Sequence, residues 1–239
     1  TTAQGARAAS SHTGSLAGDS AAFLGACRQV GVTVCDSIDE AFDAASVFAT
    51  LPIPSGPNVA VLTTVGGWGV AVADQIGKSS LLRMATISDD VMTKLNSLLP
   101  PRWSRGNPID SAGGETRETV EAIFELLLSS KQVDSVIFLG LGIQSNQARL
   151  MREGPFHPDH GIDRIVGFHE GQDTKYAQRA VELSKQFAKP ILIATELAHA
   201  DQSNPGVERL RQLGIPAFSS ARSVVRALEH ATRWGLRHA

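Results

Sequence analysis

Short apolar runs that alternate with helical patterns constrain the fold of this chain more than any other feature. From residue 58 onward, each apolar run is followed by a helical stretch or a turn-rich segment. The runs that read as strands are 59–63, 81–85, 133–141, 165–168, 190–194 and 216–218. Such alternation predicts a doubly wound, mainly parallel α/β sheet.

Helical periodicity places the connecting elements between these strands. The expected helices are 66–76, 89–98, 116–128, 173–188, 205–213 and 220–234. Residues 100–114 read as loop, and residues 144–163 read as a long loop or broken helix containing proline and histidine.

The first fifty residues form a separate pattern. Residues 1–18 are rich in glycine, serine and alanine and are expected to be loop, followed by a helix over 19–30 and a short extended piece over 32–34. Ser37, with Glu40 three residues later, predicts a capping box that opens a helix to about Thr50. Prolines and a glycine then cluster in 52–57, so we expect residues 1–50 to be the tail of one α/β domain and 57–239 to be another domain.

Composition narrows the functional class. The 239 residues are 42% hydrophobic and 19% charged with a formal charge of -2, which offers no electrostatic basis for binding nucleic acid or an anionic membrane. No apolar run approaches the roughly 20 residues of a membrane span, and no secretion signal opens the chain. Two cysteines with no metal or redox spacing favour the cytoplasm. The absence of an initiator Met leads us to expect a fragment or processed piece.

His12 is the candidate catalytic residue. It lies among small hydroxyl and glycine residues, including Ser11, Thr13 and Gly14, just before a helical pattern. Small neighbours leave an imidazole uncovered and let backbone N–H groups approach an anion, as phosphoryl transfer to histidine requires. A solvated histidine in a polar loop is the ordinary alternative.

A glycine-rich turn, Gly66-Gly67-Trp68-Gly69, connects the first strand of the larger domain to a helix. Such a turn brings backbone donors and a helix N-terminus to the carboxyl edge of the sheet, which suits a phosphate. Equally, the glycines could only permit close packing of helix on strand. The spacing is neither a dinucleotide fingerprint nor a Walker loop.

Further polar residues follow in the second part of the chain. Asn107 and Asp110 could form part of a site loop at the same edge, although Asp110 is more simply explained by Asx-type bonds within its own loop. His157 and His160 flank Pro158-Asp159 without a nearby third ligand, so we predict no metal site.

Three segments resemble the ADP-forming acyl-CoA synthetases of the acetate–CoA ligase type, relatives of succinyl-CoA synthetase. Residues 9–18 (ASSHTGSLAG) are similar to the family's phosphohistidine segment, 59–70 (VAVLTTVGGWGV) to its glycine-rich strand-to-helix turn, and 106–110 (GNPID) to its Asn-Pro-aliphatic-Asp segment. The resemblance implies a flavodoxin-like or Rossmann-like fold for 57–239, preceded by the tail of the phosphohistidine-bearing CoA-ligase domain. Where the family often has proline after the glycine pair, this chain has Trp68.

The resemblance also implies an activity. The family converts acyl-CoA, ADP and phosphate to acid, CoA and ATP, reversibly, with His12 as phosphoryl carrier. Ser11, Thr13, Gly14 and the 66–69 turn would bind phosphate. The whole enzyme would use ATP or ADP, phosphate, CoA and Mg²⁺. We expect these 239 residues to bind none of them tightly. The resemblance also implies that the enzyme is an oligomer.

Two other readings remain. The family implies CoA-binding and ATP-grasp domains as partners, and neither is visible here. Related domains fused to lysine acetyltransferases act as sensors, so a non-catalytic regulatory module is the alternative function, against which the retention of His12 counts. A flavin-binding protein is disfavoured, because the loops offer no aromatic residues for the flavin ring.

Overall fold

The computed structural model describes residues 2–13, 20–114 and 118–238. The chain forms two compact units, Thr1–Ala41 and Phe42–Ala239.

The smaller unit is helical in its described residues. It contains α1 (Ala3–Thr13), α2 (Ser20–Gln29) and the first residues of α3 (Ile38–Thr50). The expected loop over 1–18 was wrong for 3–13, because alanine at four of these positions favours a helix. The predicted α2 and α3 are confirmed, and the Glu40 amide donates to Ser37 Oγ (3.1 Å) at the start of α3.

The two compact units divide inside α3, between residues 41 and 42, and the domain boundary expected in 52–57 stays a prediction. Ala44, Val47 and Leu51 are buried, and the last two belong to the core of the larger unit. Residues 53 and 54 pack closely against Gly235 in the last helix. The proline cluster is therefore part of the larger unit and not a free linker.

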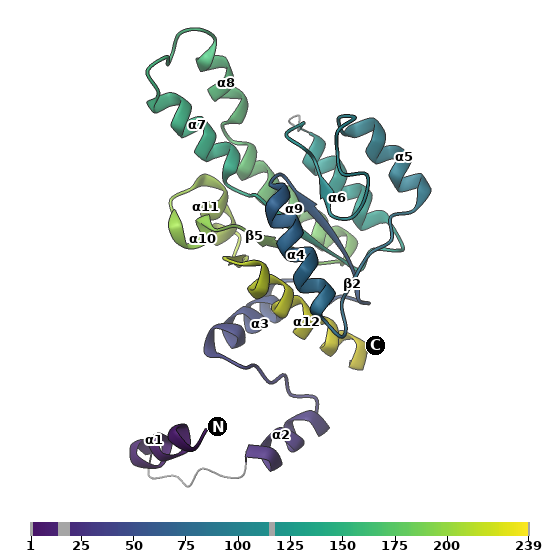
Figure 1. Cartoon of the computed structure of the whole chain (residues 1–239), viewed down its shortest axis with the longest axis vertical. Helices are drawn as coiled ribbons and strands as arrows, with labels where there is room; N and C mark the ends of the chain where they lie inside the picture. The colour runs from purple at the N-terminus through teal and green to yellow at the C-terminus, as the bar shows by residue number, and fades with distance from the viewer. Residues whose placement is uncertain (1, 14–19, 115–117, 239) are drawn as a thin grey trace. The chain divides into compact units, whose positions relative to one another are not determined.

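A parallel sheet organises the larger unit (Figure 1). Its strands run in the order β2-β1-β4-β5-β6, and β3 also pairs with β1. Their bounds are β1 (Asn58–Thr63), β2 (Arg83–Met84), β3 (Ile109–Asp110), β4 (Ser135–Leu139), β5 (Ile191–Ala194) and β6 (Ala217–Phe218). Every pairing is parallel, so the predicted doubly wound sheet is confirmed. The order reverses between β1 and β4, which is where ligands bind in folds of this kind.

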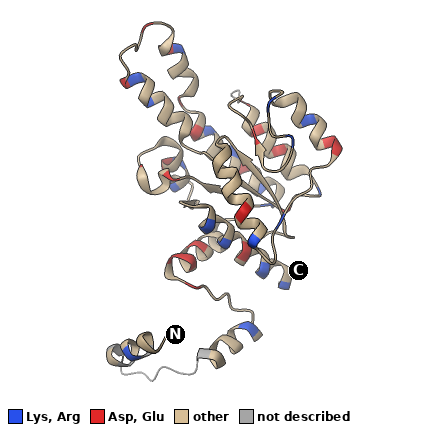
Figure 2. Cartoon of the chain, viewed as in Figure 1, with Lys and Arg blue, Asp and Glu red and all other residues tan. Residues whose placement is uncertain are grey.

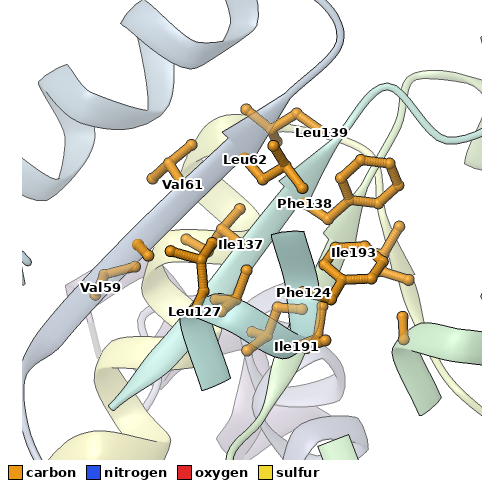
Figure 3. Close-up of a cluster of buried hydrophobic side chains, with 14 of the residues drawn as sticks. Val59, Val61, Leu62, Phe124, Leu127, Ile137, Phe138, Leu139, Ile191 and Ile193 are labelled. Atoms are coloured by element: carbon orange, nitrogen blue, oxygen red, sulfur yellow. The ribbon is translucent and has the colours of Figure 1, made fainter. Parts of the chain in front are cut away.

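Helices cover both faces of the sheet. On one face α4 (Gly66–Lys78) packs with α12 (Ala221–His238), and on the other α6 (Thr119–Ser129) packs with α9 (Gln172–Phe187), which also contacts α11 (Pro205–Gln212). Side chains alternate along the central strands, and Phe138 of β4 meets Phe124 and Tyr176 edge-on at centroid distances of 5.1 and 6.2 Å. Figure 3 shows this core of aliphatic and aromatic side chains.

Two parts of the larger unit differ from expectation. Residues 144–163 hold α7 (Ile143–Glu153), and the expected strand over 165–168 lies in α8 (Ile162–His169). Ile162, Ile165 and Val166 recur at helical spacing, and Val166 is buried, so the run packs as a helix. The expected loop over 100–114 contains the two-residue strand β3.

The remaining helices are α5 (Asp89–Leu98), which was predicted, and the four-residue α10 (Leu197–Ala200), which was not. Positive and negative side chains are both distributed over the helices of the larger unit (Figure 2), with ion pairs within α7 (Arg149–Glu153) and α9 (Arg179–Glu182). Within the described residues, we find no helix that combines the length and the apolar character needed to cross a bilayer.

Candidate functional site at the carboxyl edge of the sheet

The turn from β1 to α4 is built by backbone and hydroxyl groups. Thr63 Oγ1 accepts from the Val65 amide (2.9 Å) and donates to the Val65 carbonyl (2.7 Å). That carbonyl also accepts from the amides of Trp68 (3.0 Å) and Gly69 (3.4 Å). The Thr63 hydroxyl thus fixes Val65 in the extended conformation that precedes the helix.

Two amides at this helix start have no acceptor within the described part of the chain: those of Gly66 and Gly67. No side chain caps α4 there either. The first amides of a helix carry partial positive charge and are suited to an anion. The amides of Trp68 and Gly69 already donate to the Val65 carbonyl. Of the four backbone donors predicted in 66–69, only those of Gly66 and Gly67 therefore remain available to an anion.

Gly69 has a different role. It is buried, and a Cβ atom there would lie 3.0 Å from Thr63 Cγ2 and 3.4 Å from Pro108 Cβ. This glycine permits close packing of α4 on β1 and β3, which is the packing alternative considered from the sequence.

The Asp110 carboxylate lies beside the first residue of α4. Its Oδ1 accepts from the Ala112 amide (2.9 Å), which is the Asx-type bond expected from the sequence. Its Oδ2 would lie 2.5 Å from a Cβ atom at Gly66. A carboxylate here stabilises the helix start and at the same time opposes a second anion.

Asn107 closes a gap in the sheet. Beside β1, β2 pairs with the first residues and β3 with the last ones, Leu62 and Thr63. Between them the Asn107 amide accepts from the Val61 amide (2.9 Å) and donates to the carbonyls of Val59 (2.8 Å) and Ala85 (3.0 Å). The predicted site loop is therefore brought to the sheet edge, with the Asn107 side chain engaged by backbone and Asp110 adjacent to Gly66.

A second strand-glycine-helix turn, which sequence reasoning missed, follows β4. Gly140 and Gly142 both have positive φ, and Gly142 precedes α7. A Cβ atom at Gly140 would lie 2.1 Å from Thr64 Oγ1, so this turn meets the β1–α4 turn directly. The repeated glycine after a buried strand was the available signal.

Protein groups already fill the start of α7. The Ser145 amide donates to Asp173 Oδ2 (2.6 Å), and Asn204 Nδ2 donates to the Gly142 carbonyl (2.9 Å). Burial raises the pKa of the Asp173 carboxyl above its ordinary value, while the bond from the Ser145 amide works against that shift. The start of α7 is thus partly occupied by protein groups, whereas no group in the described residues accepts from the amides of Gly66 and Gly67 at the start of α4.

The histidines between α7 and α8 form no such site. His157 Nε2 lies 3.5 Å from Asp163 Oδ1, and the His160 ring packs edge-on against Phe156 at 6.0 Å. Both histidines lie in the connection between the end of α7 and the start of α8, so of the two readings of 144–163 the broken helix is confirmed.

The phosphohistidine-like segment belongs to the smaller unit. His12 and Thr13 lie in α1, but their side chains and the whole of Gly14 fall outside the described residues. The exposed Ser11 hydroxyl donates to the Ala8 carbonyl (2.8 Å).

Two family models match parts of the chain. Residues 1–48 match the succinyl-CoA ligase-like flavodoxin domain, and residues 59–143 match the Ligase-CoA domain. The chain is related to the ADP-forming acyl-CoA synthetases. The alpha subunit of acetate–CoA ligase (ADP-forming) II from Pyrococcus furiosus is 41% identical over 133 residues, which are 56% of this chain and 29% of that subunit.

Two further proteins match nearly the whole chain. The 4-hydroxybutyrate–CoA ligase (ADP-forming) of Nitrosopumilus maritimus is 26% identical over 97% of this chain and 29% of its own length. The structure of PH0766 from Pyrococcus horikoshii OT3 superposes with a TM-score of 0.69 at 26% identity, over 92% of this chain and 45% of that one. The chain spans less than half the length of each of these relatives.

Proposed function

We propose that this chain is part of an ADP-forming acyl-CoA synthetase, which converts acyl-CoA, ADP and phosphate to acid, CoA and ATP in a reversible reaction. The observation that carries the proposal is the start of α4, where the amides of Gly66 and Gly67 lack protein acceptors at the carboxyl edge of the sheet. The likeness to the ADP-forming synthetases suggests the type of anion, a phosphoryl group.

His12 is the proposed nucleophile. Phosphate displaces CoA from the acyl-CoA to give an acyl phosphate, an imidazole nitrogen of His12 takes the phosphoryl group with release of the acid, and ADP then accepts it to form ATP. Ser11, Thr13 and Gly14 are the proposed neighbours of the phosphoryl group. For Ser11 this role requires the hydroxyl to exchange its bond to Ala8 for one to phosphate.

The start of α4 is the proposed place where the phosphoryl group is held. Phosphoryl transfer depends on positioning and charge stabilisation, and two amides with a helix dipole provide both. Asp110 bears a negative charge beside Gly66, so the phosphoryl group must bind on the side of Gly67, where a Cβ atom would meet nothing within 4 Å.

The remaining functions belong to other parts of the enzyme. We propose CoA-binding and ATP-grasp domains as partners, in the same polypeptide or another subunit of an oligomer, with ATP or ADP, CoA, phosphate and Mg²⁺ used by the assembly in the cytoplasm. The relatives' names give acetate for one and 4-hydroxybutyrate for another, and we propose that the acid is chosen by parts of the enzyme outside these 239 residues.

The test is phosphorylation of the intact protein with labelled ATP and Mg²⁺. We expect acid-labile, base-stable label on His12 that His12→Asn abolishes and that ADP removes. His199→Asn, at an exposed histidine of α10, is the matched control and should keep the label. No label on His12 at any pH would contradict the proposal and favour a regulatory module.

A further inference from the structure

A cavity lies where α7 meets the starts of α9 and α11 (Figure 1). Its wall includes Ser145 of α7, Gly171 just before α9 and Asn204 just before α11. The volume is about 260 Å³, slightly below the roughly 300–1,000 Å³ of pockets for drug-sized ligands, so the cavity suits a small metabolite. Gly66 and Gly67 are not among the residues that line it.

The two arginines of the cavity wall are already paired with carboxylates of the same wall. Arg149 donates to both carboxylate oxygens of Glu153 (3.0 and 3.1 Å), and Arg152 forms an ion pair with Glu170. Each pair is neutral as a whole. The four residues therefore leave no net charge for a ligand to compensate.

Asp201 is the remaining charged side chain of the wall and lies between α10 and α11. Its Oδ1 accepts from the amide (3.1 Å) and the hydroxyl (2.6 Å) of Ser203. Within the described residues, Asp201 has no cationic partner and its Oδ2 accepts no hydrogen bond. An open carboxylate oxygen at the wall of a small cavity is suited to an ammonium group.

The start of α9 favours the opposite charge. The amides of its first three residues, 172–174, have no acceptor in the part of the chain that the structure describes, and no side chain caps this helix. Glu170 and Gly171, which immediately precede the helix, both line the cavity. Because the first amides of a helix point out of its N-terminus and carry partial positive charge, they are suited to a carboxylate.

Ser145 adds an independent sign of a ligand. Only 9% of its surface is exposed, it lines the cavity, and its buried hydroxyl makes no hydrogen bond with any described residue. Buried hydroxyls in proteins normally have a partner, so this one indicates a group that binds beside it. The Ser145 amide holds the Asp173 carboxyl toward α7 (2.6 Å), and burial raises the pKa of that carboxyl, which lessens the negative charge beside the α9 amides.

We propose that this cavity binds a small α-amino acid, with its carboxylate at the first amides of α9 and the Ser145 hydroxyl, and its ammonium group at Asp201. Both charges of the zwitterion then meet open groups of opposite sign, while the two arginine pairs stay intact. An anion alone leaves Asp201 uncompensated, and a cation alone leaves the α9 amides open.

Hydrogen exchange in the intact protein tests which charges the cavity requires. L-alanine is the probe, and propionate and ethylammonium, which each lack one of its two charged groups, are the matched comparisons. At about 50 mM of each compound, we expect alanine to slow exchange of the amides at 172–174 by at least about tenfold and neither analogue to do so. No slowing by alanine, or equal slowing by either analogue, overturns the proposal.

A pair of variants locates the ammonium group. Asp201→Asn keeps an acceptor for Ser203 but removes the charge, so we expect it to raise the alanine concentration needed for half of the slowing by at least about tenfold. Asp159→Asn, at an exposed position outside the cavity wall, is the matched control and should respond as the natural chain does. An unchanged response in Asp201→Asn contradicts the proposal.

A second pair locates the carboxylate. Ser145→Ala removes the unpartnered hydroxyl and should weaken alanine binding by about tenfold, whereas Ser129→Ala, at the exposed end of α6, should not change it. Unchanged binding in Ser145→Ala contradicts the proposed place of the carboxylate. Exchange at the start of α9 requires no phosphorylation of His12, so this proposal and the proposed function can fail separately.

Discussion

The side-chain amide of Asn107 takes the place of a neighbouring strand for Val61, accepting its backbone N–H at 2.9 Å in the gap between β2 and β3. The same amide donates to the carbonyls of Val59 and Ala85. One side chain thus completes the hydrogen bonding of the strand that leads into the proposed phosphate site.

Asn107→Ala is expected to lower the free energy of unfolding by about 2–4 kcal/mol, because the Val61 amide of a buried strand and the Ala85 carbonyl lose their Asn107 partner. Urea unfolding followed by circular dichroism measures the change. Gln202→Ala, at an exposed position between α10 and α11, is the control and should change stability by less than about 0.5 kcal/mol. Equal stability of the two variants would show that the Asn107 bonds contribute nothing.

Gly66→Ala is expected to destabilise the larger unit by about 1–3 kcal/mol, because the new methyl would lie 2.5 Å from Asp110 Oδ2. Gly67→Ala places its methyl in open space and should stabilise α4 by up to about 1 kcal/mol. When Gly66→Ala is introduced into the Asp110→Ala variant, it should lower the free energy of unfolding much less than it does in the natural chain. If the losses simply add, the contact between Gly66 and Asp110 is not the cause.

The buried carboxyl of Asp173 is expected to make the free energy of unfolding decrease as the pH rises. Burial raises its pKa in the folded state, so between its ordinary pKa and that raised value the folded chain binds more protons than the unfolded chain. This contribution to stability is therefore fully present at low pH and is lost as pH rises through that window.

Asp173→Asn should remove this dependence while its amide oxygen still accepts from Ser145. We expect the stability of the variant relative to the natural chain to increase from about pH 4 upward, above the ordinary pKa of aspartate. Urea midpoints at a series of pH values measure the effect, with Asp201→Asn as the control. A relative stability that falls with rising pH would mean that the bond from Ser145 outweighs burial.

Gly235→Ala is expected to cost about 1–3 kcal/mol, because its methyl would lie 2.4 Å from the Pro54 carbonyl oxygen and 2.8 Å from Ile53 Cγ2. Gly77→Ala, in α4 with open space around it, is the matched control and should be neutral or stabilising. Thermal unfolding measures both. An unchanged Gly235→Ala variant would mean that residues 53 and 54 do not pack tightly against the last helix.

Local pattern predicted the regular elements well. The central strands are continuous apolar runs because both of their faces are covered, and α9 and α12 show the spacing of one buried helix face. The run at 165–168 was predicted as a strand, but an apolar run of this length is equally compatible with a strand and with a helix. β3 could not be predicted, since its two residues are strand only through their pairing with Leu62 and Thr63.

For the candidate site, too, some features could be predicted from the sequence and others only from the tertiary structure. Composition and motif alone indicated a phosphate-binding turn at 66–69 and the Asx bond of Asp110, because glycine freedom and short side-chain bonds are properties of neighbouring residues. Only the tertiary structure decided that Trp68 and Gly69 have no free amides, that Asn107 completes β1, and that Asp173 fills the start of α7. These contacts join residues far apart in the chain, and their geometry is fixed by the packing of the sheet and its helices rather than by any local pattern.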